Sequence, residues 1–452
     1  MVQTAEFDRH GCYSYRKICS VAIPILLSLL MEHIIGMTDT AFLGRVSETA
    51  LGASALGTVY FLAFFVLGAG FSFGSQILIA RRNGEKNFRA AGQICYAGGF
   101  FLAIFSLILI FAIKYLSPVL LPLMVKSPDI CSAAIEYLNF RTYGLFFAFI
   151  TTVFRAFYVG IARTKILTVS SVIMVLANIV FNYALIFGKY GMPEMGIAGA
   201  ALASSIAEAV SMVCYIVYTL KYIDLKKYGF DRIAAMTDTK ILKKVFSVSI
   251  WMMVQPFFSI GVWFFFFIAV EQLGERSLAV VNVVRCLTTL SFIIIQAFAT
   301  AANSLVSSLT GEKKADQVWR LIRKVMLVSA AAVMPFLIFM TVFPEICLRI
   351  YTDNPSLIAD SVDSLYVVCF ANVLQIGSFI LFNAVSGAGA VKISALIETV
   401  NLLIYAALVY LIIIRLRPVP AIAWLTEISY QVIRGILCFI YLISGNWRNN
   451  KI

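Results

Sequence analysis

Long runs of apolar residues alternate with short polar or charged segments along the whole chain. Most runs are about 20 residues or longer, which is the length that an α-helix needs to cross a hydrocarbon core roughly 30 Å thick. Gly, Pro and charge clusters mark the breaks between them. About twelve spans are predicted, near residues 18–40, 51–80, 93–116, 130–160, 166–188, 196–219, 245–270, 278–309, 322–343, 361–387, 391–414 and 419–443. The pattern therefore predicts an all-α polytopic membrane protein.

Composition agrees with this interpretation. Of the 452 residues, 61% are hydrophobic and 13% are charged, whereas roughly a quarter of the residues of a soluble domain are charged. The formal net charge of +13 is spread over the short segments between the apolar runs. Because it forms no continuous basic patch, we expect no nucleic-acid partner.

Basic residues gather in alternate segments between the spans, at both termini and in the even-numbered loops. Loops rich in Lys and Arg stay in the cytoplasm. We therefore expect a multi-pass plasma-membrane protein with both termini cytoplasmic and with a cytoplasmic linker at residues 221–244. Arg415 and Arg417 fall on the opposite side and disagree with the rule.

The chain contains an internal repeat with one constant offset, which carries position 84 onto position 311. Gly84-Glu85-Lys86 recurs as Gly311-Glu312-Lys313, and further pairs at this offset are Glu48 and Glu275, Leu51 and Leu278, Pro128 and Pro355, Glu136 and Asp363, Gly160 and Gly387, and Lys165 and Lys392. The repeat predicts an N-terminal six-helix lobe at 1–220 and a C-terminal six-helix lobe at 245–452. Six spans per lobe give both lobes the same orientation, which is typical of carriers that open alternately to each side.

Polar residues inside the spans are the candidate functional residues, because ionisable groups in hydrocarbon are costly. Glu32 and Asp39 lie seven residues apart on one face of the first span. Asn178 and Asn182 lie one turn apart in the fifth span, so that their carbonyl oxygens can share a cation with Asp39. The alternative is that Asp39 caps its helix and the asparagines bond to neighbouring helices.

The second half lacks these polar residues. At the offset of the repeat, the counterparts of Asp39, Asn178 and Asn182 are Phe266, Tyr405 and Val409. The cation site is therefore expected in the first lobe, with Na⁺ bound at Asp39, Asn178 and Asn182 or with a proton on the carboxyl group, whose neutral form burial favours. Glu398 in span 11 and Arg155 in span 4 are weaker candidates, and Arg155 has the alternative of extending toward the interface.

Motifs of other protein classes are missing from the sequence. It contains no G-x-x-x-x-G-K-[ST] loop and no H-E-x-x-H motif. The nine cysteines are scattered and form no Cys-x-x-Cys pair. We therefore expect neither an enzyme nor a bound cofactor.

Three segments resemble the multidrug and toxic compound extrusion (MATE) transporters. They are Gly36–Arg45 (GMTDTAFLGR), Phe154–Thr164 (FRAFYVGIART) and Asn178–Ala200 (NIVFNYALIFGKYGMPEMGIAGA). The resemblance implies an antiporter, acting as a monomer in a bacterial inner membrane, that expels organic cations or other drugs in exchange for Na⁺ or H⁺.

The resemblance also implies roles for individual residues. A span-1 aspartate and span-5 polar residues form the cation site of such proteins, matching Asp39, Asn178 and Asn182, and Pro24 matches a proline that bends the first helix. Some branches carry acidic residues in spans 7 and 10, where this sequence has Gln255 and Gln375.

Two other functions remain alternatives. The first is a flippase for lipids or lipid-linked glycans, which would need several basic residues along its cleft. The second is a channel or a receptor. A channel would show a charged ring or a filter loop.

Overall fold

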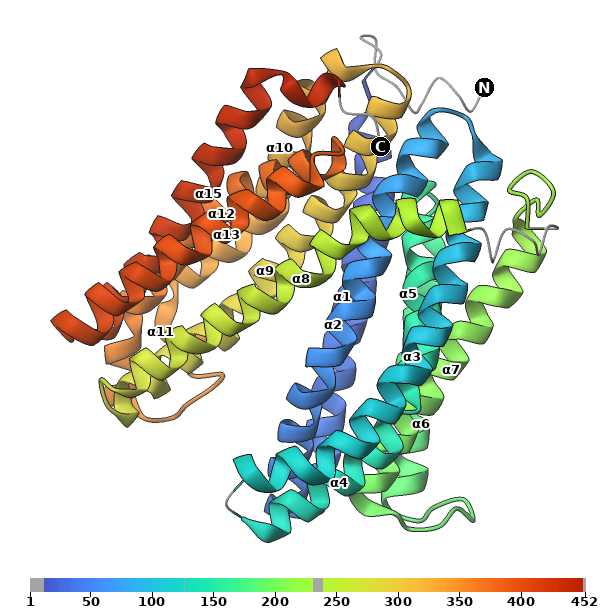
Figure 1. Cartoon of the computed structure of the whole chain (residues 1–452). Coiled ribbons are helices and arrows are strands. Elements are labelled where there is room, and N and C mark those ends of the chain that lie inside the picture. Colours follow the sequence, from blue (N-terminus) through green and yellow to red (C-terminus); the bar gives the residue numbers. More distant parts are fainter. Residues whose placement is uncertain (1–11, 126, 231–238, 450–452) are drawn as a thin grey trace. The chain divides into compact units, whose positions relative to one another are not determined.

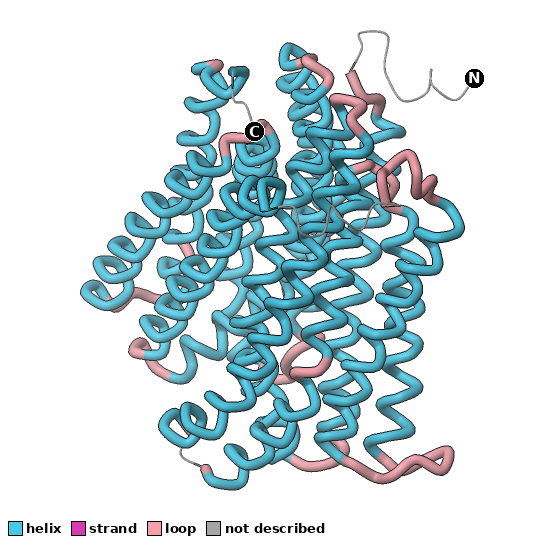
Figure 2. The backbone as a smooth tube through the Cα atoms, turned by 45° about the vertical axis from the view of Figure 1, so that its right-hand side comes forward, coloured by secondary structure: helices cyan, strands magenta, loops and turns pink. Residues whose placement is uncertain are grey.

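The computed structural model describes residues 12–125, 127–230 and 239–449. The secondary structure in these ranges is helical and includes no strand (Figure 2). The main helices, most of them labelled in Figure 1, are α1 (Tyr15–Leu43), α2 (Glu48–Gly84), α3 (Phe88–Met124), α4 (Pro128–Arg141), α5 (Gly144–Gly160), α6 (Lys165–Ile186), α7 (Gly196–Tyr222), α8 (Thr239–Glu271), α9 (Glu275–Gly311), α10 (Val318–Val342), α11 (Pro344–Leu348), α12 (Pro355–Gly387), α13 (Val391–Leu408), α14 (Pro420–Ala423) and α15 (Leu425–Ser444). A π-helical stretch, Val409–Arg415, extends α13.

Among the described residues, eleven helices are long and apolar enough to cross a membrane, and the pair α4 and α5 brings the number to twelve if it counts as one span. The predicted all-α membrane fold is thus confirmed. Four prolines stand at the first turn of α4, α11, α12 and α14, where no backbone hydrogen bond is lost. Other prolines lie inside helices, among them Pro24 in α1 and Pro256 in α8.

The span predicted at 130–160 is not one straight helix, because α4 and α5 meet at an angle of 50°. The break coincides with a charged pair between Arg141, at the end of α4, and Glu208 of α7. A Cβ atom on Gly144 would lie 2.4 Å from atoms of both side chains. The ion pair thus occupies the space next to Gly144 that a side chain at this position would fill.

The internal repeat is visible in the backbone. Helices α2 and α9 begin and end at positions related by the offset of the repeat. Left-handed backbone conformations recur at the same offset, with φ of 58° at Lys86 and 60° at Lys313, and with 56° at Tyr190 and 48° at Arg417. Because L-residues other than glycine rarely adopt such angles, their repetition indicates that both halves use the same connections.

Residue contacts divide the chain into two compact units. One unit is Leu27–Met253, and the other combines the residues up to Leu26 with Val254–Ile452. The two boundaries lie within α1 and α8, at positions that the offset of the repeat makes equivalent. Each unit thus contains about one repeat length. The first part of α1 belongs to the unit that contains the second half of the sequence, and the first part of α8 belongs to the unit that contains the first half.

Hydrogen bonds explain this division. Before the boundary in α1, Tyr13 donates to Glu312 Oε1 (2.8 Å) and accepts at its carbonyl from Lys324 Nζ (2.9 Å). Before the boundary in α8, Ser249 donates to the carbonyl of Phe71 (3.0 Å). The lobes predicted at 1–220 and 245–452 were instead divided at loops. Within the predicted linker 221–244, residues 231–238 lie outside the described part, and α8 begins at Thr239.

Helices α2 and α8 approach each other closely at small residues. A Cβ atom on Gly70 of α2 would lie 2.2 Å from the carbonyl oxygen of Met252. On the same helix, a Cβ atom on Gly52 would meet only the Ile130 side chain, at 3.9 Å. Small residues allow such backbone contacts between membrane helices, where dispersion forces replace the hydrophobic effect.

We predict that Gly70→Ala lowers the stability of the purified protein by about 1–3 kcal/mol, because the methyl group has to push two helix backbones apart. Gly52→Ala serves as the control and leaves stability unchanged or slightly raised, since alanine is the better helix former. Thermal unfolding in detergent measures both variants. Equal midpoints for the two variants would contradict this packing.

Candidate functional site

The carboxylate of Asp39, in α1, is the centre of a hydrogen-bond network in the first unit. Its Oδ1 accepts from Asn178 Nδ2 (3.1 Å) and Asn182 Nδ2 (2.6 Å), both in α6. Its Oδ2 accepts from the hydroxyl of Ser204 in α7, at 3.0 Å. Three neutral donors on two helices therefore hold one carboxylate on a third.

The two asparagines are positioned by the helix period and by each other. They lie one turn apart on α6, and neither side chain is exposed. Asn182 Nδ2 also donates to Asn178 Oδ1 (3.1 Å), and Asn178 Nδ2 lies 3.2 Å from the Ser204 hydroxyl. Asn182 Oδ1 is buried without a hydrogen-bond partner among the described residues. It is a buried acceptor next to Asp39.

The structure brings together Asp39, Asn178 and Asn182, the group on which the sequence argument rests. The orientation differs from the expectation, however, because the amide nitrogens, and not the carbonyl oxygens, face the carboxylate. Ser204 was not predicted. Serine is frequent in membrane helices, and the helical period alone does not show that its hydroxyl faces α1.

Glu32 forms a separate site. Its carboxylate pairs with Arg155 of α5 and accepts a long hydrogen bond from Ser28 (3.5 Å). The hydroxyl of Ser28 also lies 2.6 Å from that of Ser171. Arg155 therefore has an intramembrane partner and does not simply extend toward the interface. The stripe expected from Glu32 to Asp39 is divided between two different networks.

A cavity of about 770 Å³ opens beside Asp39. Its described lining includes three carboxylates, from Asp39, Glu48 and Glu208, and one basic group, from Arg141. Arg141 donates to both carboxylate oxygens of Glu208, at 3.0 and 2.7 Å. Since this pair is neutral, the cavity has negative polarity from Asp39 and Glu48.

Aromatic groups contribute to the same region. The Arg141 guanidinium lies 3.9 Å from the centroid of the Phe61 ring, and the phenol of Tyr137 forms part of the cavity wall. Tyr137 also lies 3.3 Å from the hydroxyl of Thr58. The described lining thus combines the ring of Tyr137 with carboxylates, a combination that suits organic cations.

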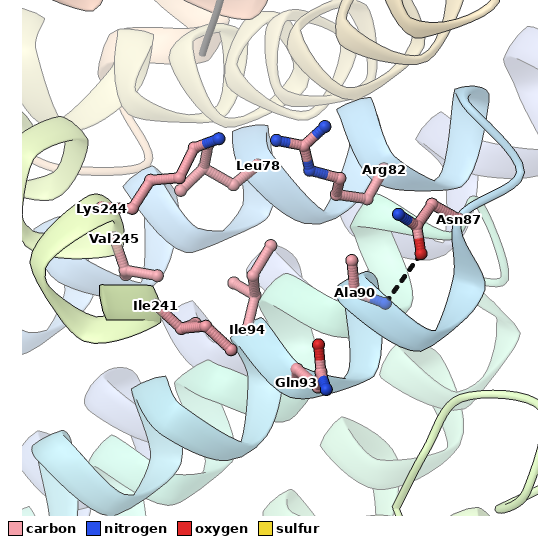
Figure 3. Close-up of a pocket in the computed structure, with 9 residues that line it drawn as sticks. All are labelled: Leu78, Arg82, Asn87, Ala90, Gln93, Ile94, Ile241, Lys244 and Val245. Carbon is pink, nitrogen blue, oxygen red and sulfur yellow. Dashed lines mark hydrogen bonds between the residues drawn. The ribbon is translucent and has the colours of Figure 1, made fainter. Parts of the chain in front are cut away.

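A smaller cavity of about 270 Å³ lies between α2, α3 and the first part of α8. Figure 3 shows the charged ends of Arg82 and Lys244 along one edge of it, with Ile94 and Ile241 on the opposite side. Its polarity is positive, opposite to that of the cavity at Asp39. Arg82 is, moreover, paired with Glu85.

The second unit fills the counterpart of the Asp39 site with rings. Phe266, at the position equivalent to Asp39, is fully buried and lies 6.4 Å from the ring of Tyr405, the equivalent of Asn178. Glu398, the weaker candidate, is buried elsewhere in that unit and bonds to Ser259 and Tyr430.

Comparisons with known proteins agree with the fold and the repeat. The MatE family model matches two segments, 24–184 and 250–411, whose bounds are related by nearly the same offset as the repeat. The chain is 27% identical to the probable multidrug resistance protein NorM of Thermotoga maritima over 442 residues, covering 97% of this chain and 94% of that protein. It is 25% identical to the multidrug resistance protein MdtK of Pectobacterium atrosepticum, covering 76% and 75%.

Solved transporter structures have the same fold. An outward-facing multidrug resistance MATE family transporter of the MOP superfamily superposes with a TM-score of 0.86 at 18% identity, covering 97% of both chains. A MOP superfamily transporter from Pyrococcus furiosus, described as having a binding pocket of reverse polarity, superposes with a TM-score of 0.85 at 18% identity, covering 95% of both. Together with the two matched segments, these similarities identify the chain as a multi-pass membrane protein that belongs to the MatE family, the multidrug and toxic compound extrusion transporters.

Proposed function

We propose that this protein exports organic cations by secondary active antiport, in exchange for a cation that binds at Asp39. The observation that carries the proposal is that the carboxylate of Asp39 belongs both to the cavity and to the hydrogen-bond network. Asp39 lines the 770 Å³ cavity and is also the acceptor of the Asn178, Asn182 and Ser204 network. Substrate and coupling ion therefore compete for the same negative charge.

The charge of the cavity supports a cationic substrate. Asp39 and Glu48 are its uncompensated carboxylates, because Glu208 is paired with Arg141. A charged amine near the Tyr137 ring gains both Coulombic and cation–π attraction, and both are stronger away from water. The NorM and MdtK relatives are named as multidrug resistance proteins, which supports drugs as substrates.

The lining offers little to an anionic head group, which a flippase would have to bind. Among the described lining residues, the basic group is Arg141, and both of its donating nitrogens are engaged by Glu208. Releasing Arg141 would leave Glu208 as an unpaired charge in a nonpolar region, which is costly. Antiport of a cation is therefore our preferred function over lipid transfer.

Of the two coupling ions, we favour the proton. The groups that face Asp39 are two N–H donors and one O–H donor, whereas Na⁺ binding would require oxygen ligands. Both amides would have to turn for their oxygens to face the ion. A proton needs a single acceptor for the new carboxyl O–H, and a turn of the Asn182 amide alone would supply it, since Asn182 Oδ1 is buried without a partner among the described residues.

We propose that Pro24 acts as a hinge in the transport cycle. It lies inside α1, two residues before the boundary between the two units. A proline lacks the N–H that would bond to the carbonyl one turn earlier, so the helix bends there at lower cost. Pro256 occupies a similar place in α8, just after the second boundary.

We further propose that the protein works as a monomer in a bacterial plasma membrane, with both termini in the cytoplasm. The support is the distribution of Lys and Arg, which are concentrated in the loops on the side of the termini. Each chain carries its own cavity and its own Asp39 network within a single unit, so that no second copy is needed to complete the site.

Efflux of a fluorescent organic cation from proteoliposomes tests the function, with proton and sodium gradients imposed separately. We expect the proton gradient to drive efflux by the wild type, and we expect Asp39→Asn to reduce it to the rate of protein-free vesicles, because the neutral amide exchanges no proton. Asp353→Asn, at an exposed position, is the matched control and should retain full activity. Failure of both gradients to drive efflux would refute the antiport proposal, and coupling to sodium alone would refute the proton.

Ser204→Ala tests the network. The hydroxyl stabilises the ionised carboxylate, so its loss favours the cation-bound state, and a hydrogen bond to a charged group contributes about 1.5–3 kcal/mol. We therefore expect half-maximal efflux at a coupling-ion concentration that is about tenfold to a hundredfold lower than for the wild type. Ser205→Ala is the matched control, since Ser205 bonds to backbone carbonyls of Phe140 and Ala201. Equal ion dependence of the two variants would exclude a role for Ser204.

A further inference from the structure

The second unit contains a buried polar cluster that the proposed function does not use. Its centre is Glu398 of α13, whose side chain is 3% exposed. Glu398 Oε1 accepts from the hydroxyl of Tyr430 in α15 and from the hydroxyl of Ser259 in α8, at 3.3 Å. Glu398 Oε2 is buried and has no hydrogen-bond partner among the described residues. One oxygen of this carboxylate is thus satisfied and the other is not.

The nearest positive charge reaches Glu398 only indirectly. Arg434 of α15, itself 4% exposed, donates from Nη1 to the Tyr430 hydroxyl at 3.3 Å. Its Nη2 donates to the hydroxyl of Ser378 (3.1 Å) and to Gln431 Oε1. Tyr430 therefore stands between the guanidinium and the carboxylate, and the described residues include no direct ion pair between Arg434 and Glu398.

The cluster has an excess of acidic groups. Glu427, one turn before Gln431 on α15, accepts a hydrogen bond from Gln431 Nε2 at 2.6 Å. The cluster therefore contains two carboxyl groups, from Glu398 and Glu427, and one guanidinium, from Arg434. The remaining titratable groups near Glu398 and Arg434 are Tyr405, Tyr430 and Cys438, which are neutral in their ordinary state. Helices α8 and α12 contribute the uncharged Ser259 and Ser378.

With both carboxylates ionised, the cluster would have a net charge of −1 inside the membrane. An uncompensated buried charge costs several kcal/mol, and proteins usually avoid it by neutralising the group. The free Oε2 of Glu398 offers the place for a proton. Asn401 lies three residues further on the same face of α13, is fully buried, and has a carbonyl oxygen without a partner among the described residues. It is an acceptor suited to a neutral carboxyl O–H.

We propose that Glu398 is a second proton-binding site of this transporter, with Tyr430 as the positioning residue that joins it to Arg434. The site has no counterpart in the first unit, where the positions equivalent to Glu398, Tyr430 and Arg434 are Ser171, Ala203 and Ala207. The Asp39 site, in turn, is replaced by Phe266 and Tyr405 in the second unit. Each half therefore carries one proposed proton-binding site, and the two sites lie at positions that are not equivalent.

Infrared difference spectroscopy of the purified full-length protein tests the proposal without any transport assay. All variants carry Asp39→Asn, which removes the carboxyl signal of the first unit. As the pH is lowered, we expect a carboxyl C=O band of one buried, slowly exchanging proton per chain, and we expect Glu398→Gln to remove it. Glu427→Gln is the matched variant. It should keep the band but change its midpoint, because it removes the neighbouring carboxylate. Persistence of the band in the Glu398 variant would overturn the assignment.

A conservative variant covers the case in which Glu398→Gln does not fold. Tyr430→Phe keeps the ring but removes the hydroxyl that stabilises the ionised form, so the band should persist with a midpoint at higher pH. An unchanged midpoint would refute the positioning role of Tyr430, and absence of any titrating band in the Asp39→Asn background would refute the second site. Since no result depends on efflux, failure here is distinguishable from failure of the antiport proposal.

Discussion

Hydrocarbon supplies no hydrogen bonds, so every polar group that enters the membrane must find its partner within the protein. The backbone meets this constraint by forming helices from one end of the described chain to the other. The charged side chains meet it by pairing, as Arg141 does with Glu208 and Arg155 with Glu32. These pairs determine local structure, since the Arg141–Glu208 pair coincides with the bend between α4 and α5. Asp39 and Glu398 have no direct basic partner among the described residues, and their hydrogen-bond donors are neutral groups on neighbouring helices.

The same constraint explains how much could be predicted from the sequence. The length of an apolar run follows from membrane thickness, so the spans could be predicted from the sequence. The repeat and the family could be predicted as well, from recurring residues and from three characteristic segments. Asp39, Asn178 and Asn182 were found because polar residues in apolar helices are rare and because the helix period places the asparagines on one face. Their contact with Asp39 required only that α1 and α6 be neighbours.

Other features depend on three-dimensional packing and leave little trace in the sequence. The sequence does not show which face of α7 meets α1, so Ser204 was missed, and it does not determine which end of an amide turns toward a carboxylate. Glu32 shares a helical stripe with Asp39, yet it pairs with Arg155 of α5, a partner that the sequence does not reveal. The bend at Gly144 could not be predicted either, since a glycine in an apolar run occurs for many structural reasons besides the space that an ion pair needs.

Two places where the chain passes from one unit to the other, within α1 and within α8, bear on the origin of the duplication. Each half contributes the first part of its first helix to the unit formed mainly by the other half. A half-length ancestor with this connectivity would have lacked that part of its own fold. It would have completed itself by exchanging the segment with a second copy, as a domain-swapped dimer does. Gene fusion would then have made permanent an association that the two copies already required in order to fold.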